Sequence, residues 1–279
     1  MPMRSKPLAD LLGSLPPDQG FALIPNRKLY ELYAWMLHCR LLAERMPVLV
    51  REEGLAPTGD AAGFEAACVA CALDLGSADT LAPGPHALTP CFVKGLPMAS
   101  LHGLLKSSQT RVPWARYKIV SPVLSLEEQL DRALAAAAAN RSTKNRKVAV
   151  AFCGDYAAAR ASLRKAMARA GKEKLPVLFV CRNVVDGEDA AAVAARCGLP
   201  GIAADLSDAV AIYRVATESL AHARRGNGAT LIECRPWPLV AEAADPLLLM
   251  EQALKRRGIF SAKLKTQTAA VFKRQFAVR

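Results

Sequence analysis

The clearest pattern along the chain is a pair of short apolar runs, rich in β-branched residues, on either side of a long polar and alanine-rich segment. The runs are Val148–Cys153 and Val177–Cys181, and the segment between them is rich in Ala, Arg and Lys. Short apolar runs of this kind are typical of buried strands, whereas the composition between them favours a helix. The order of these segments predicts a βαβ unit.

Both predicted strands end in polar residues, Gly154-Asp155 after the first and Arg182-Asn183 after the second. The carboxyl edge of a parallel sheet binds anionic ligands, because free N–H groups and helix dipoles favour negative charge there. The side-chain oxygens of Asp155 and Asn183 would suit Mg²⁺, which usually shares its ligands with a bound phosphate. The pattern therefore indicates a metal–diphosphate site, although Gly-Asp after a strand is also a common turn.

A further helix is predicted after Ser125. Ser125 and Glu128 have the spacing of a capping box, and the sequence continues through the alanine-rich stretch DRALAAAAAN. Its small side chains predict that this helix packs closely against another element.

Composition fits one α/β domain, since 279 residues with 52% hydrophobic side chains can bury a full core. Prolines near the start predict an N-terminal arm over residues 1–26, followed by a single domain over residues 27–279. Charges interrupt every apolar stretch, and the N-terminus lacks the apolar region of a signal peptide. We therefore expect a cytoplasmic protein without a membrane segment.

The eight cysteines lie mostly in apolar runs, which predicts reduced core residues rather than disulfides. Cys68 and Cys71 form the only C-x-x-C, without a second pair or a histidine at zinc spacing, so metal binding is not favoured. Cys153 and Cys181 end the two site strands, and core packing is preferred over catalysis for both.

The formal net charge of +12 favours an anionic partner or a negatively charged neighbouring subunit. Solvated surface is the simpler interpretation of the basic clusters. Aromatic residues are only 6% of the chain, so stacking on bases, and with it nucleic-acid binding, is not favoured. The main basic clusters contain Lys144, Arg146 and Lys147; Arg164, Lys165, Arg169, Lys172 and Lys174; and Lys255, Arg256 and Arg257.

The stretch from Val148 to Asn183 resembles the thiamin diphosphate-binding core of the alpha subunit of pyruvate and branched-chain 2-oxo acid dehydrogenases, which has the pattern G-D-G and then N-N. The resemblance implies a thiamin diphosphate-binding α/β fold, a mainly parallel sheet flanked by helices. It also implies thiamin diphosphate and Mg²⁺ as cofactors, with Gly154, Asp155, Asn183 and His86 at the cofactor and Asp155 and Asn183 at the metal. Similarity extends to residues 29–46, 63–83, 197–235 and 245–261.

The departures from the family pattern gather at this site. Tyr156 replaces the glycine that lets the backbone approach the diphosphate, and Val184 stands where the family has its second asparagine, the metal ligand. Asn183 would substitute only if the backbone shifted by one residue, which turns its side chain to the opposite side of the strand.

Other parts of the family's site have changed as well. His86 stands where the family has an arginine, and an imidazole cannot reproduce the bidentate grip of a guanidinium on phosphate. No glycine occurs between Gly103 and Gly154, the region in which the family has a glycine-rich cradle and an active-site histidine. The loop after Val184 is shorter than in the family, and of the remaining histidines only His102 is placed to approach the site.

Two hypotheses remain open. One is a non-catalytic or repurposed alpha-like subunit that has lost Mg²⁺–thiamin diphosphate binding. The other is an active alpha subunit that oxidatively decarboxylates a 2-oxo acid together with a beta subunit. The partners implied by the resemblance are a transketolase-like beta subunit or a second alpha-like chain, and a lipoyl acyltransferase core. We favour the first hypothesis because four contacts to the cofactor have changed together.

Overall fold

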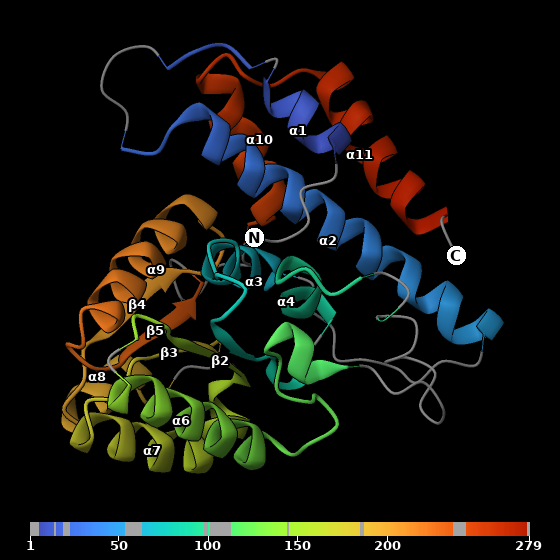
Figure 1. Cartoon of the computed structure of the whole chain (residues 1–279). Coiled ribbons are helices and arrows are strands. Elements are labelled where there is room, and N and C mark those ends of the chain that lie inside the picture. The colour runs from blue at the N-terminus through green and yellow to red at the C-terminus, as the bar shows by residue number, and fades with distance from the viewer. Residues whose placement is uncertain are drawn as a thin grey trace.

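The computed structural model describes residues 6–13, 15–18, 23–53, 63–86, 88–97, 100, 113–143, 145–184, 187–236 and 244–277. Within them, five parallel strands form one sheet in the order β1-β2-β3-β5-β4 (Figure 1). The strands are β1 (Thr80–Ala82), β2 (Ala149–Asp155), β3 (Val177–Arg182), β4 (Gly201–Asp205) and β5 (Thr230–Arg235). The predicted α/β class with a parallel sheet flanked by helices is confirmed.

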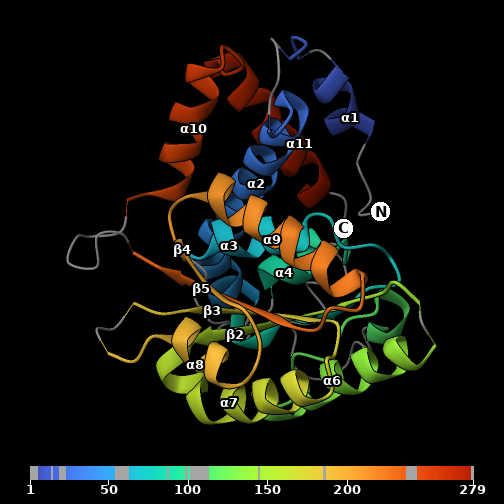
Figure 2. The same ribbon diagram turned by 90° about the vertical axis from the view of Figure 1, so that its left-hand side faces the viewer.

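Helices cover the sheet on both sides. They are α1 (Lys6–Gly13), α2 (Asn26–Glu53), α3 (Glu65–Ala72), α4 (Leu88–Val93), α6 (Leu126–Ser142), α7 (Tyr156–Lys172), α8 (Ala190–Arg196), α9 (Ala209–Arg224), α10 (Pro246–Arg256) and α11 (Ala262–Ala277), with short 3₁₀ turns η1 (Gly84–His86) and η2 (Trp114–Tyr117). In Figure 2, α6, α7 and α8 lie below the sheet, whereas α3, α4 and α9 lie above it and are covered in turn by α2, α10 and α11.

Alternate side chains of the central strands enter two different cores. Val150 and Phe152 pack with the helices above the sheet, and Ala151 and Cys153 pack with α6, α7 and α8 below it. A parallel sheet that is buried on both faces needs nearly continuous apolar strands, which is why β2 and β3 are recognisable in the sequence.

The predicted βαβ unit is β2-α7-β3, and the predicted helix after Ser125 is α6. Ser125 accepts a hydrogen bond from the Glu128 backbone N–H, and the Glu128 side chain accepts one from Ser125, so the capping box is confirmed. The alanine-rich stretch of α6 packs on α7 and β2, with Ala133 and Ala137 buried. Close packing of this helix is thus confirmed.

The amino edge of the sheet is held together by one buried acid. Asp79, just before β1, accepts hydrogen bonds from the backbone N–H of Val148 at 3.0 Å and of Gly76 at 2.7 Å, and it pairs with Arg224 at the end of α9. This carboxylate joins the starts of β1 and β2 to a helix of the upper layer.

All eight cysteines are free thiols, and seven of them are buried. Burial raises the pKa of the Cys153 thiol to about 12, and burial also raises the pKa of the Cys68 and Cys71 thiols. Protonated, enclosed thiols are poor nucleophiles and poor metal ligands, in agreement with a packing role. In the described part of the chain, no helix is both long and apolar enough to cross a bilayer.

Candidate cofactor site

The candidate site lies at the carboxyl edge of the sheet, where β2 and β3 end side by side. The pairing of these strands runs regularly to Phe152 and then shifts, so that Asp155 is level with Arg182. Gly154 precedes the acid with a φ of 69°, a conformation that favours glycine. The irregularity ends β2 and starts α7 at the next residue, Tyr156.

Asp155 is bound by an arginine of the neighbouring strand. Arg182 donates from Nε to Asp155 Oδ1 at 2.6 Å and from Nη2 to Oδ2 at 3.2 Å, a bidentate pair that occupies both carboxylate oxygens. The Arg182 side chain is 20% exposed and its guanidinium lies over the ring of Phe64, 5.9 Å from the centroid. Asp155 is also the N-cap residue of α7, yet its side chain makes no capping hydrogen bond. The carboxylate therefore accepts hydrogen bonds from the arginine and does not cap α7.

Asn183 is held on the opposite side, next to β5. Its Nδ2 donates to Glu233 Oε1 at 2.6 Å and to the backbone oxygen of Glu188 at 3.1 Å, and the residue is 8% exposed. Both hydrogen bonds of this amide group therefore go to residues on the β5 and α8 side of the site. Val184, which follows it, is 45% exposed.

Glu233 is a site residue that sequence reasoning missed. It is fully buried on β5, and its Oε2 accepts from the backbone N–H of Ala191 at 2.9 Å. Burial raises the pKa of the Glu233 carboxyl, whereas the hydrogen bond from Glu233 lowers the pKa of the neighbouring Asp189. This carboxyl pair fixes the start of α8. A lone Glu in the run TLIECR carried the only signal, an acid inside an otherwise apolar strand.

Tyr156 turns away from the upper layer and into the lower core. The residue is 3% exposed, packs among the side chains of α6, α7 and α8, and donates from its hydroxyl to Glu188 Oε2 at 2.9 Å. Glu188 also pairs with Arg160 and Arg196, both at 3.0 Å. The segment after β3 is therefore fastened to the first turns of α7 and to α8.

The described histidines lie in different elements of the fold. The backbone of His86 forms the last residue of η1, close to the end of β1, and its predicted role at the cofactor stays a prediction. His102 lies outside the described residues. His38 is 1% exposed in α2 and its Nε2 bonds the backbone oxygen of Thr268 at 3.0 Å, far along the chain from the strand ends.

Both residues that the resemblance assigns to Mg²⁺, Asp155 and Asn183, have protein partners in this side-chain arrangement. A second cation against Asp155 would be repelled by the Arg182 guanidinium, which already bonds both carboxylate oxygens. Asn183 would have to leave Glu233, and burying that carboxyl without its partner is unfavourable. Among the described residues, His, Cys, Asp and Glu side chains form no group of three or more suited to a metal ion.

Comparison with known proteins identifies relatives over most of the chain. The chain is 27% identical to the 3-methyl-2-oxobutanoate dehydrogenase subunit alpha of Mycobacterium tuberculosis, in a match that covers 88% of this chain and 76% of the relative. It is also 27% identical to the pyruvate dehydrogenase E1 component subunit alpha of Staphylococcus aureus, over 75% of this chain and 60% of the relative.

One solved structure that matches is described as a putative thiamin diphosphate-dependent enzyme from Mycobacterium smegmatis. The match covers 65% of this chain and 32% of the solved chain, with 14% sequence identity and a TM-score of 0.45. A likeness this weak carries no conclusion about function. The family described as "Dehydrogenase E1 component" matches residues 33–237, more than half of the chain. The chain therefore belongs to the dehydrogenase E1 component family and is similar to its alpha subunits.

Proposed function

We propose that this chain is a non-catalytic, alpha-type subunit of a 2-oxo acid dehydrogenase that has lost Mg²⁺–thiamin diphosphate binding. The observation that carries the proposal is the bidentate pair between Arg182 and Asp155. The guanidinium lies against the one acid that the family resemblance assigns to the metal. An arginine cannot lose its charge at physiological pH, so it competes with a metal ion at every pH at which Asp155 is ionised.

The free energy of cofactor binding is reduced by the changed residues. Each charge-assisted contact to a diphosphate or its metal contributes about 1.5–3 kcal/mol, and Tyr156, Val184 and His86 each stand where the family has a residue suited to such a contact. Release of Arg182 and Asn183 from their present partners adds a further cost. Binding would have to recover this cost through the two remaining candidate ligands, Asp155 and Asn183.

The proposed role is structural or regulatory within a hetero-oligomer. The relatives named above are alpha subunits, and we propose a transketolase-like beta subunit or a second alpha-like chain as the direct partner. A lipoyl acyltransferase core would then be a further partner of the assembly. The wholly α-helical layer of α2, α10 and α11 offers surface for such contacts without involving the sheet edge.

Calorimetric titration with thiamin diphosphate tests the loss of cofactor binding. The full chain, alone and co-purified with a beta-type partner, is titrated with and without Mg²⁺. We expect no Mg²⁺-dependent heat in either case. Asp155→Asn and Arg182→Leu serve as paired variants. Asp155→Asn should leave the result unchanged, whereas Arg182→Leu removes the competing charge, and Mg²⁺-dependent heat restored by it alone would show that Arg182 excludes the metal.

The competing function is that of an active alpha subunit, which oxidatively decarboxylates a 2-oxo acid together with a beta subunit. The retained side chains of Asp155 and Asn183 at the strand ends favour this alternative. Micromolar, Mg²⁺-dependent binding that Asp155→Asn abolishes would establish this alternative and overturn our proposal. Co-expression with a beta-type subunit tests the partner separately: co-purification in a fixed ratio is expected, and its absence would leave the chain without the proposed role.

A further inference from the structure

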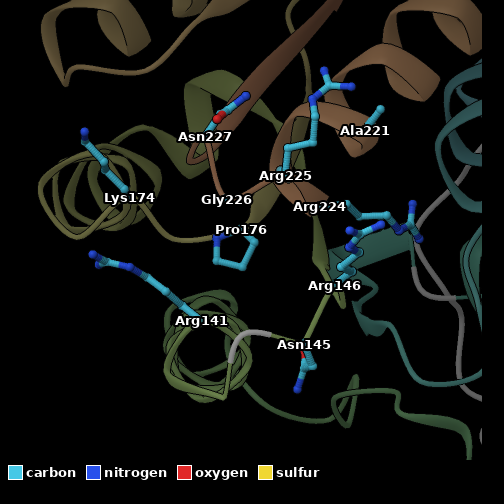
Figure 3. A pocket seen from close by; sticks show the side chains of 11 residues that line it. Arg141, Asn145, Arg146, Lys174, Pro176, Ala221, Arg224, Arg225, Gly226 and Asn227 are labelled. Carbon is cyan, nitrogen blue, oxygen red and sulfur yellow. The ribbon is translucent and has the colours of Figure 1, made fainter.

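A concave site lies at the amino edge of the sheet, at the opposite edge from the candidate cofactor site. The cavity has a volume of about 960 Å³ and is lined by the segments that precede β2, β3 and β5 and by the ends of α6 and α9. Figure 3 shows Pro176 in the middle of the lining, with Lys174 and Arg141 to one side, Arg146 and Arg224 to the other, and Arg225 above. This volume falls within the range of small-molecule sites.

The lining is strongly positive. Five of its residues are cationic, none is acidic, and Asn145 and Asn227 supply neutral polar groups. Asp79 behind Arg224 neutralises one charge, and the three nearby helix C-termini contribute roughly half a negative charge each. An excess of about 2.5 positive charges therefore remains after the helix ends are taken into account.

Two of the five cations have structural partners and three do not. Arg141 donates to the backbone oxygen of Glu173, and Arg224 pairs with Asp79. Within the described residues, the side chains of Arg146, Lys174 and Arg225 have no hydrogen bond or ion pair with the protein. These three come from three different loops and line one cavity.

The backbone conformation of Lys174 is unusual for a residue with a side chain. Lys174 follows α7 with a φ of 45°, in the left-handed region that favours glycine. The Leu175 N–H bonds the Ala170 oxygen and the Lys174 N–H bonds the Gly171 oxygen, a helix ending that places this residue in the left-handed conformation. Lys174 lines the cavity at a position suited to glycine, and its Nζ is directed outward in Figure 3. A non-glycine residue at such a position is an observation from which a side-chain role can be inferred.

We propose that this cavity binds a small molecule that carries two or more phosphate groups. Arginine and lysine side chains from separate loops can each reach a different phosphate oxygen, and the two asparagines can bond the remainder. The lining includes no aromatic side chain, so it offers no platform for stacking bases. The inference does not depend on the state of the cofactor site.

Titration of the full chain with inorganic tripolyphosphate in the absence of Mg²⁺ tests this proposal. We expect saturable binding, weakened about 10-fold or more by Lys174→Gly and again by Arg225→Ala, because each removes a charge-assisted contact. Lys174→Gly is a sharp variant because glycine relieves the positive φ, so the fold should be at least as stable as before. Lys172→Ala removes one charge from the exposed last turn of the same helix and is the matched control.

Equal weakening by Lys174→Gly and Lys172→Ala would mean diffuse attraction to a basic surface and would overturn the proposal, as would the absence of binding at about 0.15 M salt. The test is also separable from that of the cofactor site. Binding of thiamin diphosphate that needs no Mg²⁺ and is lost in Lys174→Gly belongs to this cavity, whereas Mg²⁺-dependent binding that survives Lys174→Gly belongs to the Asp155 edge.

Discussion

Arg182 and Asp155 meet because β2 and β3 run parallel and their register places the two residues at the same level. The positions of Asp155 and Asn183 at neighbouring strand ends followed from the apolar runs before them. Their hydrogen-bond partners could not be predicted in this way. Arg182 lies next to Asn183, which drew attention as the metal-ligand candidate, and Glu233 lies fifty positions beyond Asn183 in the chain. A strand end can be predicted from local sequence, but the direction of its side chains depends on strands that are distant in sequence.

His38 should make the protein sensitive to mild acid. Burial lowers the pKa of its imidazole from 6.5 to about 4, against a smaller opposing effect of the bond to Thr268. Between these values the unfolded chain takes up a proton that the folded chain refuses, so stability falls as the pH falls. From pH 7 to pH 4 the loss from this residue should be about 3 kcal/mol.

Urea unfolding between pH 7 and pH 4 measures this effect through the variant His38→Gln, which keeps a donor for the Thr268 oxygen. The variant should lose stability less steeply on acidification than the wild type. His222→Gln, at a partly exposed position of α9, is the control and should follow the wild type. Parallel profiles for wild type and His38→Gln would contradict the prediction.

Elements with a strong local signal were predicted well. The βαβ unit and the capped helix were recognised because buried parallel strands are continuously apolar and because a capping box is a fixed spacing. The three-residue strand β1 was not recognised, since its pairing with β2 owes little to its own sequence and much to the anchor at Asp79. The strand order, which brings β5 between β3 and β4, likewise had no local signal.

Gly84 at the end of β1 should tolerate no side chain. Its φ is 66°, and a Cβ placed on it would lie 2.0 Å from the backbone oxygen of Phe152 in β2. Gly84→Ala combines an unfavourable left-handed residue with a clash against backbone, so the free energy of unfolding should fall by about 2–4 kcal/mol.

Gly258→Ala provides the matched control, because Gly258 has a φ of 68° and nothing lies within 4 Å of an added Cβ. Urea unfolding of both variants separates backbone conformation from steric contact. Equal losses of stability in the two variants would show that the contact with Phe152 contributes nothing.

At the scale of the whole molecule, the central strands join the two cores. The apolar residues of α2, α10 and α11 belong to the same core as Val150 and Val180, so the helical layer and the sheet share buried side chains. Leu12 of α1 and Ile24 belong to this core as well, so the segment expected as an N-terminal arm over residues 1–26 packs against the helical layer. The single domain over residues 27–279 stays a proposal.

The shared core predicts one cooperative unfolding transition. Trp35 of α2 is 6% exposed and contacts Phe92 of α4 edge to face, with ring centroids 5.2 Å apart, so its fluorescence reports on the helical layer. In a variant that keeps only this tryptophan (Trp114→Phe, Trp237→Phe), fluorescence and far-UV circular dichroism should give the same urea midpoint. Two separate midpoints would show that the helical layer and the sheet unfold independently.

The Arg182–Asp155 pair also determines where the positive charge that neutralises Asp155 comes from. A metal ion stabilises a protein by an amount that grows with the logarithm of its free concentration, and a protein that depends on the ion is incompletely loaded when the ion is scarce. Arg182 is part of β3, so every chain carries its own positive charge for Asp155. That charge is in place as soon as β2 and β3 pair. The edge can therefore form during synthesis of the chain, before any small ion or coenzyme is encountered.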